Sequence, residues 1–141
     1  RTIRDSRNLN QSGRLAALVA GNAAVSRAAK IGVGSIVMQM ALVNAGAVIG
    51  ENCIINNRSL IEHGARVGDH SHISTGTIVN GDCEIGQRVF VGSGAVLRNG
   101  IRVGDDVRIG AGAVVVQDLS QPGWYVGNPA RPTSAVDSAK V

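Results

Sequence analysis

Aromatic residues are scarce in this sequence. They make up 2% of its 141 residues, as one Trp, one Tyr and one Phe. This scarcity excludes a globular core built on large side chains, because aromatic rings usually supply much of the buried area there. It also argues against nucleic-acid binding, since almost no ring is available to stack on bases. The net charge of +4 would suit an acidic ligand, but the arginines are scattered along the chain.

Long apolar runs are missing as well. No stretch approaches the roughly 20 apolar residues that a membrane-spanning helix needs, so we expect no membrane span. No low-complexity segment and no long insertion interrupts the chain, and its length allows one domain. The sequence starts at Arg1 and shows no secretory signal.

In place of these features the sequence has a repeat of six residues. Seventeen consecutive hexads each begin with an aliphatic residue, without an insertion: Val19, Val25, Ile31, Val37, Val43, Ile49, Ile55, Ile61, Val67, Ile73, Val79, Ile85, Val91, Leu97, Val103, Ile109 and Val115. A period of six matches neither an α-helix nor a simple β-meander. A fixed short period indicates a stacked solenoid.

A second period of eighteen lies on top of the first. Glycine recurs every eighteen residues, each time after Ile or Val: Gly32, Gly50, Gly68, Gly86 and Gly104. Eighteen is three sixes, so one coil has three sides and three corners. We therefore predict an all-β fold, a triangular parallel β-solenoid with the first positions inside and small fifth positions at tight corners. We expect glycine to supply turn conformations that side chains resist.

The repeat divides the chain into three parts. Residues 1–18 lie off the pattern and are interpreted as a leader or linker. Residues 19–120 form the solenoid, and residues 121–141 are interpreted as a C-terminal cap and tail that cover the last coil. A solenoid end exposes unpaired strand edges, so a covering segment is expected there.

The two cysteines, Cys53 and Cys83, both occupy fifth positions on different sides of the prism. We expect both thiols to be buried and unpaired. Free thiols are typical of a reducing compartment, so a cytoplasmic location is expected.

His63 is the candidate general base. It occupies a third position, and third positions are mostly polar or glycine, so the side chain should face outward. The residues one coil away in its column are Ala45 and Gly81, which leave the imidazole in a recess. Histidine is the usual general base at neutral pH, although a surface histidine without a role is the alternative interpretation.

The other histidines have weaker signals. His72 ends its hexad, which we interpret as a corner, and its column neighbours Ile54 and Phe90 also allow a simple packing role. Three histidines within ten residues raise the question of zinc. His70 and His72 are two residues apart, but His63 lies half a coil away and no further Cys or His completes a set. We therefore predict no metal site.

A column of small residues forms a candidate groove. Thr75, Ser93 and Ala111 are each one coil apart and are flanked by glycines. Such a stripe has accessible backbone groups and could bind a thin, extended ligand. The alternative is that these glycines only make the corners.

The chain resembles the hexapeptide-repeat acyltransferases, within them the sialic acid O-acetyltransferases and UDP-amino-sugar N-acetyltransferases. The matching segments span the whole solenoid: residues 43–50 (VNAGAVIG), 61–63 (IEH), 67–74 (VGDHSHIS) and 127–130 (GNPA). The resemblance implies a left-handed parallel β-helix. It assigns the catalytic base to His63 and the acetyl-CoA contacts to His72 and to the main chain at Ser93 and Ala111.

The chain differs from the family pattern at three sites. The family usually has Asp or Glu directly after the catalytic histidine, where this chain has Gly64. Asn57-Arg58 replaces a commoner Thr-Gly, and Ala20-Gly21 replaces a commoner His-Pro. The family often has an N-terminal nucleotide-sugar-binding domain, and residues 1–18 resemble its end.

The resemblance implies an acetyl-CoA-dependent transferase acting on an amino or hydroxyl group of a sugar or nucleotide sugar, in surface glycan synthesis. If His63 and His72 serve one thioester, they must come from different subunits, because nine residues are half a coil. We therefore predict a homotrimer with its sites between subunits. The alternatives are a non-catalytic trimeric scaffold or degenerate enzyme, favoured by Gly64, and a zinc carbonic anhydrase of the same fold.

Overall fold

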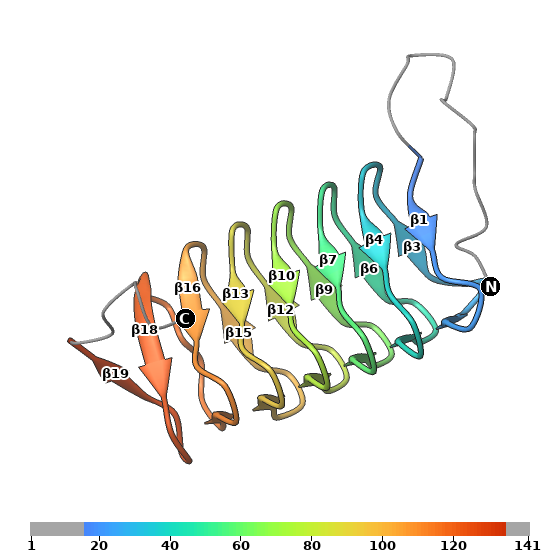
Figure 1. The fold of residues 1–141 in the computed structure, drawn as a ribbon. Helices are drawn as coiled ribbons and strands as arrows, with labels where there is room; N and C mark the ends of the chain where they lie inside the picture. Colours follow the sequence, from blue (N-terminus) through green and yellow to red (C-terminus); the bar gives the residue numbers. More distant parts are fainter. Residues whose placement is uncertain (1–15, 135–141) are drawn as a thin grey trace.

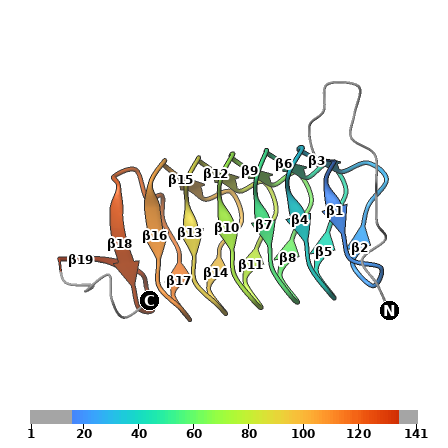
Figure 2. The ribbon, with the colours of Figure 1, turned by 45° about the horizontal axis from the view of Figure 1, so that its top comes forward.

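The computed structural model describes residues 16–134, which wind into a three-sided prism of short parallel strands (Figure 1). Each coil contributes one strand to each of three sheets, called sheets A, B and C here, and the three rows are visible in Figure 2. Strands that are eighteen residues apart pair in parallel, for example Ile54 with His72 and His72 with Phe90. The predicted triangular parallel β-solenoid is confirmed.

Most strands are only two residues long and cover the sixth and first positions of neighbouring hexads. Sheet A contains β1 (Leu18–Val19), β4 (Ile36–Val37), β7 (Ile54–Ile55), β10 (His72–Ile73), β13 (Phe90–Val91), β16 (Val107–Ile109), β18 (Gly123–Val126) and β19 (Arg131–Thr133). Sheet B contains β2 (Ala24–Val25), β5 (Leu42–Val43), β8 (Leu60–Ile61), β11 (Ile78–Val79), β14 (Val96–Leu97) and β17 (Val114–Val115). Sheet C contains β3 (Lys30–Ile31), β6 (Val48–Ile49), β9 (Arg66–Val67), β12 (Glu84–Ile85) and β15 (Arg102–Val103).

The first-position aliphatic residues form the interior, as the repeat predicts. Ile55, Ile61, Ile73, Val79 and Leu97 are all fully buried. Burial of one such side chain contributes roughly 1.5–3 kcal/mol, and neighbouring coils bury them against one another. The core is therefore a continuous column of aliphatic side chains along the axis of the prism.

The small fifth positions are buried at the corners and tie one coil to the next. Ser35 Oγ donates a hydrogen bond to the carbonyl of Gly50 over 2.7 Å and accepts one from the N–H of Cys53 over 2.9 Å. Ser71 Oγ donates in the same way to the carbonyl of Gly86 over 3.0 Å. These hydroxyls are almost inaccessible to water, so the bonds satisfy groups that would otherwise be costly to bury.

Cys53 and Cys83 follow the same pattern with thiols. Both are fully buried and free, as predicted. Their sulfurs lie 3.2 Å from the carbonyl oxygen of Gly68 and 3.1 Å from that of Arg98, respectively. Burial raises the pKa of both thiols, which keeps them protonated and able to donate.

Glycine has a different role from the one expected at the eighteen-residue spacing. The left-handed backbone conformation occurs at fourth positions, where every hexad from residue 34 to residue 112 has a φ between 51° and 71°. Gly68 occupies a second position and lacks a positive φ. A Cβ built there would lie 2.6 Å from the backbone of Gly86. The eighteen-spaced glycines therefore permit close stacking of successive coils at one corner.

The last described segment extends sheet A. Strand β18 pairs in parallel with β16, and β19 returns antiparallel to β18. Tyr125 is buried and its hydroxyl donates to the carbonyl of Gln121 over 2.9 Å. The Asn128–Pro129 peptide bond is cis. Residues 1–15, which include most of the predicted leader, and residues 135–141 lie outside the described part of the chain.

Candidate functional site

His63 lies in the turn between β8 and β9, at the corner where sheets B and C meet. Its side chain is 60% exposed, so the predicted outward orientation is correct. The imidazole lies over Gly81, one coil further on. A Cβ at residue 81 would be 2.6 Å from His63 Nε2 and 2.7 Å from Cε1. The recess predicted from the spacing therefore exists, and the absence of a side chain at Gly81 creates it.

Glu62, which the sequence analysis did not select, contacts His63 directly. One carboxylate oxygen, Oε2, lies 3.5 Å from His63 Nδ1 and accepts a hydrogen bond from the His63 main-chain N–H over 3.2 Å. The same oxygen accepts from Asn44 Nδ2 over 2.8 Å. The Asn44 amide and then the His63 N–H hold the pKa of Glu62 below its usual range, so this residue is a carboxylate at neutral pH.

Two further groups lie close to the place above Gly81 that the His63 ring occupies. Asn99 Nδ2 reaches to 3.2 Å from the point that a Cβ of Gly81 would occupy, so its amide and the imidazole both come close to that point. The Gly81 main-chain N–H donates to no other group within residues 16–134. The His63 imidazole and the Asn99 amide therefore lie close to Gly81, whose own main-chain N–H is unpaired within the described residues.

We predict that Gly81→Ala lowers the kcat of the acetyl transfer implied by the family resemblance by tenfold or more, without destabilising the fold. Gly81 has no positive φ, so alanine fits the backbone. The new methyl group would overlap the tip of the His63 ring and would press on the amide of Asn99, which is the end of an exposed side chain. The imidazole would have to leave its position. Steady-state kinetics should show a fall in kcat, whereas thermal unfolding should stay within a few degrees of wild type. Full activity in this variant would mean that the position of His63 over Gly81 is irrelevant.

His72 lies on strand β10, on the outer face of sheet A, and not at a corner as its place in the hexad suggested. The strands cover sixth and first positions, so a sixth-position residue faces outward from a flat side. The ring is half-buried, packs edge-on against Phe90 with 5.5 Å between centroids, and lies 3.3 Å from Asn56 Nδ2. Desolvation lowers the pKa of His72, which favours a neutral imidazole.

The fold does not bring His63 and His72 together within one chain. His63 is at the corner between sheets B and C, and the outer face of sheet A lies on the opposite side of the prism. The half-coil separation counted from the sequence therefore holds in three dimensions.

The column of Thr75, Ser93 and Ala111 lies along the corner between sheets A and B, and all three residues are exposed. Their main-chain N–H groups make no hydrogen bond to any other group between residues 16 and 134. The neighbouring Gly76, Gly94 and Gly112 face open space, since a Cβ there would meet no atom within 4 Å. The result is a shallow strip with a row of free backbone donors.

No group of three or more potential metal ligands occurs in the described residues, which include all three histidines. His70 occupies a fourth-position turn with a φ of 60°, separate from His63. Nor does the described part of the chain contain a helix that is long and apolar enough to cross a bilayer.

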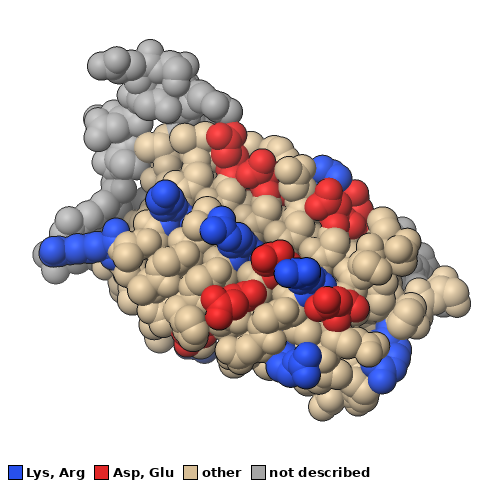
Figure 3. Space-filling view, turned by 180° about the vertical axis from the view of Figure 1, so that it is seen from behind, with Lys and Arg blue, Asp and Glu red and all other residues tan. Residues whose placement is uncertain are grey.

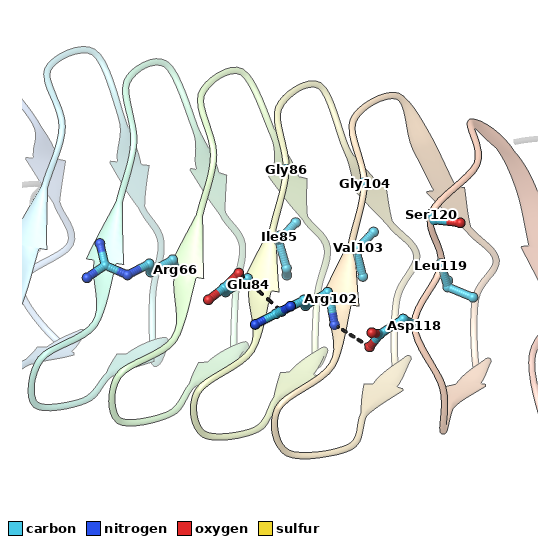
Figure 4. A pocket seen from close by; sticks show the side chains of 10 residues that line it. All are labelled: Arg66, Glu84, Ile85, Gly86, Arg102, Val103, Gly104, Asp118, Leu119 and Ser120. Atoms are coloured by element: carbon cyan, nitrogen blue, oxygen red, sulfur yellow. Dashed lines mark hydrogen bonds and ion pairs between the residues drawn. The ribbon is translucent and has the colours of Figure 1, made fainter.

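Charged side chains of both signs lie next to one another on the rear face of the molecule, without a field of one sign (Figure 3). A hollow of about 510 Å³ lies over sheet C and includes neither His63 nor the Thr75 column. Arg102 crosses it (Figure 4). Its Nε lies 3.5 Å from Glu84 Oε2, and its main-chain N–H donates a hydrogen bond to Asp118 Oδ1. The hollow is thus crossed by an ion pair and a hydrogen bond of Arg102, and it is separate from the candidate site residues.

A family model described as bacterial transferase hexapeptide (six repeats) matches residues 46–81 and 82–117, together more than half of the chain. The chain belongs to this family. The resemblance stated from the sequence is thereby confirmed, and with it the left-handed parallel β-helix. A comparison with curated proteins gives no match.

Solved structures of sugar acetyltransferases are similar to this chain. The acetyltransferase domain of PglB from Neisseria gonorrhoeae FA1090, solved alone and with acetyl coenzyme A, is 38% identical, with a TM-score of 0.84 over 85% of this chain and 58% of that one. PerB from Caulobacter crescentus, solved with CoA and GDP-perosamine, is 33% identical, with a TM-score of 0.84 over 86% of this chain and 58% of that one. The chain thus spans less than two thirds of the length of these relatives.

Proposed function

We propose that this chain is an acetyltransferase that moves an acetyl group from acetyl-CoA to an amino or hydroxyl group of a nucleotide-linked sugar. The observation that supports this most strongly is the position of His63, exposed above Gly81 with a carboxylate at its Nδ1. Such an imidazole can accept a proton at Nε2 from an attacking nucleophile. The relatives support the substrates, because PglB was solved with acetyl coenzyme A and PerB with CoA and GDP-perosamine.

The chain's own groups suffice for the proton transfers of this reaction. His63 Nε2 takes the proton of the acceptor as its nitrogen or oxygen adds to the thioester carbonyl. The free N–H of Gly81 is available to stabilise the negative charge that develops on the carbonyl oxygen. As the carbon–sulfur bond breaks, the protonated imidazole returns the proton to the departing thiolate. General-base assistance of this kind contributes roughly 10²–10⁴-fold.

We propose that the coenzyme arm lies along the Thr75–Ser93–Ala111 strip. Its amide carbonyls need donors, and the strip offers three unpaired main-chain N–H groups with no side chain above its glycines. His72 is the further coenzyme contact, from the adjoining sheet A. Asn57 and Arg58 lie at the N-terminal end of the same corner and are larger than the Thr-Gly pair that is commoner in the family. The arm is therefore proposed to run from Thr75 toward the C-terminal coils.

The active unit is proposed to be a homotrimer. His63 and His72 lie on opposite sides of one prism, so a single thioester can meet both only between two subunits. The outer face of sheet B offers the contact surface, because every outward residue of its strands is apolar: Ala24, Leu42, Leu60, Ile78, Val96 and Val114. The corresponding residues of sheet C are mostly charged, which suits a face in water. When three such prisms assemble around a three-fold axis, a corner of one chain lies against a flat side of its neighbour.

An amino acceptor is favoured over a hydroxyl. A perosamine N-acetyltransferase variant from Caulobacter crescentus, solved with CoA and GDP-perosamine, is 32% identical, with a TM-score of 0.85 over 86% of this chain and 58% of that one. The alternative of a non-catalytic scaffold loses its main support, since Glu62 supplies a carboxylate at the imidazole despite Gly64. A cytoplasmic location is also proposed, because buried free thiols are typical of a reducing compartment.

The test is thermal unfolding with and without acetyl-CoA. A ligand that binds only the folded state at one hundred times its Kd stabilises it by about 2.7 kcal/mol, so the melting temperature should rise by several degrees. Ala111→Trp should abolish most of that rise, because the indole would cover the strip. Arg27→Trp, at an exposed third position of the first coil, is the matched control and should keep it. No rise in the wild-type chain would favour the scaffold, and an unchanged rise in Ala111→Trp would place the coenzyme elsewhere.

A further inference from the structure

We propose that Glu62, anchored by Asn44, is the positioning residue that fixes the tautomer and orientation of His63. The inference rests on the proposed role of His63 as the base. A base needs an unprotonated Nε2 toward the substrate, and a neutral imidazole achieves this only when its proton is on Nδ1. A carboxylate acceptor at Nδ1 favours that tautomer.

The geometry assigns this acceptor to Glu62 Oε2. The oxygen is 3.5 Å from Nδ1, a long contact of the kind that tightens when a substrate binds. The opposite ring nitrogen, Nε2, is the one above Gly81, 2.6 Å from the point that a Cβ there would occupy. The carboxylate and the reaction space are therefore on opposite edges of the ring, which is the arrangement that a tautomer-fixing partner requires.

Asn44 prevents Glu62 from turning away. Its Oδ1 accepts a hydrogen bond from the Ala45 N–H over 2.7 Å, and its Nδ2 donates to Glu62 Oε2 over 2.8 Å. Both halves of the amide are thus used, so its orientation is set by the backbone of its own coil. The contact pattern runs from Asn44 to Glu62 to the His63 ring, across two adjacent coils.

The structure also explains why the carboxylate does not follow the histidine. Gly64 has a φ of 67°, and a Cβ there would meet the Asp82 carboxylate. An acidic residue at this position would clash with Asp82 and would bring a second negative charge next to it. Glu62 supplies the same chemical group from the other side of the histidine, at a second position where the backbone is relaxed.

A simpler role for Glu62 must be separated from this one. Asn44 and Asn56, also at second positions, cap the N–H of the following residue in the same manner. Glu62 does so too, and a cap alone would affect stability but not the imidazole proton. The decisive readout is therefore the tautomer of His63, which a capping role would not change.

The experiment measures the ¹⁵N shifts of the histidine rings in alkaline solution, where imidazoles are neutral, with His63 assigned by comparison with His63→Asn. The wild type should show an unprotonated Nε2 and a protonated Nδ1. Glu62→Ala and Asn44→Ala should shift His63 toward a mixture of tautomers, and Glu62→Gln, which keeps an oxygen acceptor for the cap, should shift it in the same direction. Asn80→Ala is the matched control, because this second-position amide bonds to the Leu97 carbonyl and should leave His63 unchanged.

Kinetics supply a second readout. Glu62→Ala should lower kcat by roughly tenfold or more, less than the loss of the base itself, with little change in the KM for acetyl-CoA. The same tautomer in wild type and Glu62→Ala, or a protonated Nε2 in the wild type, would overturn the inference. A fixed tautomer in a chain that transfers no acetyl group would leave the inference intact and contradict only the proposed function.

Discussion

His63→Ala is expected to lower acetyl transfer by about 10²–10⁴-fold, because the acceptor would lose its general base. The side chain is exposed and makes no contact with the aliphatic core, so its loss should change neither the fold nor the binding of acetyl-CoA. Thiol release from acetyl-CoA in the presence of acceptor measures the first effect. The rise in melting temperature on adding acetyl-CoA measures the second.

His70→Asn is the matched control for this variant. It removes an exposed imidazole only seven residues away, and asparagine tolerates the positive φ of that position. It should retain near-wild-type turnover. Activity of His63→Ala within about threefold of wild type would remove His63 from the mechanism, since a lost base costs far more.

Mixing two inactive variants is expected to restore activity. His72→Ala chains keep a native His63, and His63→Ala chains keep a native His72. Because each proposed site takes one histidine from each of two neighbours, random mixed trimers should have both native residues at about a quarter of their interfaces. Co-refolding the two variants and measuring turnover tests this directly, and sedimentation should give three times the chain mass.

The control is the same mixture without subunit exchange, made from separately assembled variants. It should remain inactive. If the co-refolded mixture is also inactive while each variant still assembles, the two histidines do not serve a shared site. A monomer that stays fully active on dilution would contradict the site between subunits altogether.

The sequence predicted the fold well because one physical rule governs every coil. An aliphatic residue every six positions can be buried only if the chain turns at the same interval, so Ile61 and Val79 identify their own places in the core. The spacing of eighteen also predicts the neighbour above any residue. This spacing predicted that Gly81 lies one coil away from His63, and that the missing side chain there leaves a recess for the imidazole.

The predicted corner position of His72 was wrong because the period does not say which positions form strands. Counting from the aliphatic residue made the sixth position look like the end of a unit, whereas the strands cover the sixth and first positions together. The glycine spacing misled for a similar reason. Gly68 and its equivalents recur because the backbones of two successive coils touch there. The positive φ values occur instead at fourth positions, which residues other than glycine, such as Met40, Arg58 and His70, also occupy.

Glu62 could not be recognised from spacing alone, because its contact with His63 depends on a side chain that folds back over its own turn. The available signal was chemical: Asn44, Asn56 and Glu62 are polar residues at the second positions of their hexads. The free N–H groups of Ser93 and Ala111 were likewise invisible, since the repeat does not show which backbone donors remain unpaired. Both features become visible only in the three-dimensional structure.

The most direct test of the acetyltransferase assignment follows an isotope-labelled acetyl group from acetyl-CoA by mass spectrometry, with nucleotide-linked amino sugars at high concentration as acceptors. Wild type should transfer the label to the acceptor, with one thiol released for each acetyl group gained, and His63→Ala should transfer almost none. Unlabelled acceptor and intact acetyl-CoA after incubation with the folded, trimeric wild type would contradict the assignment.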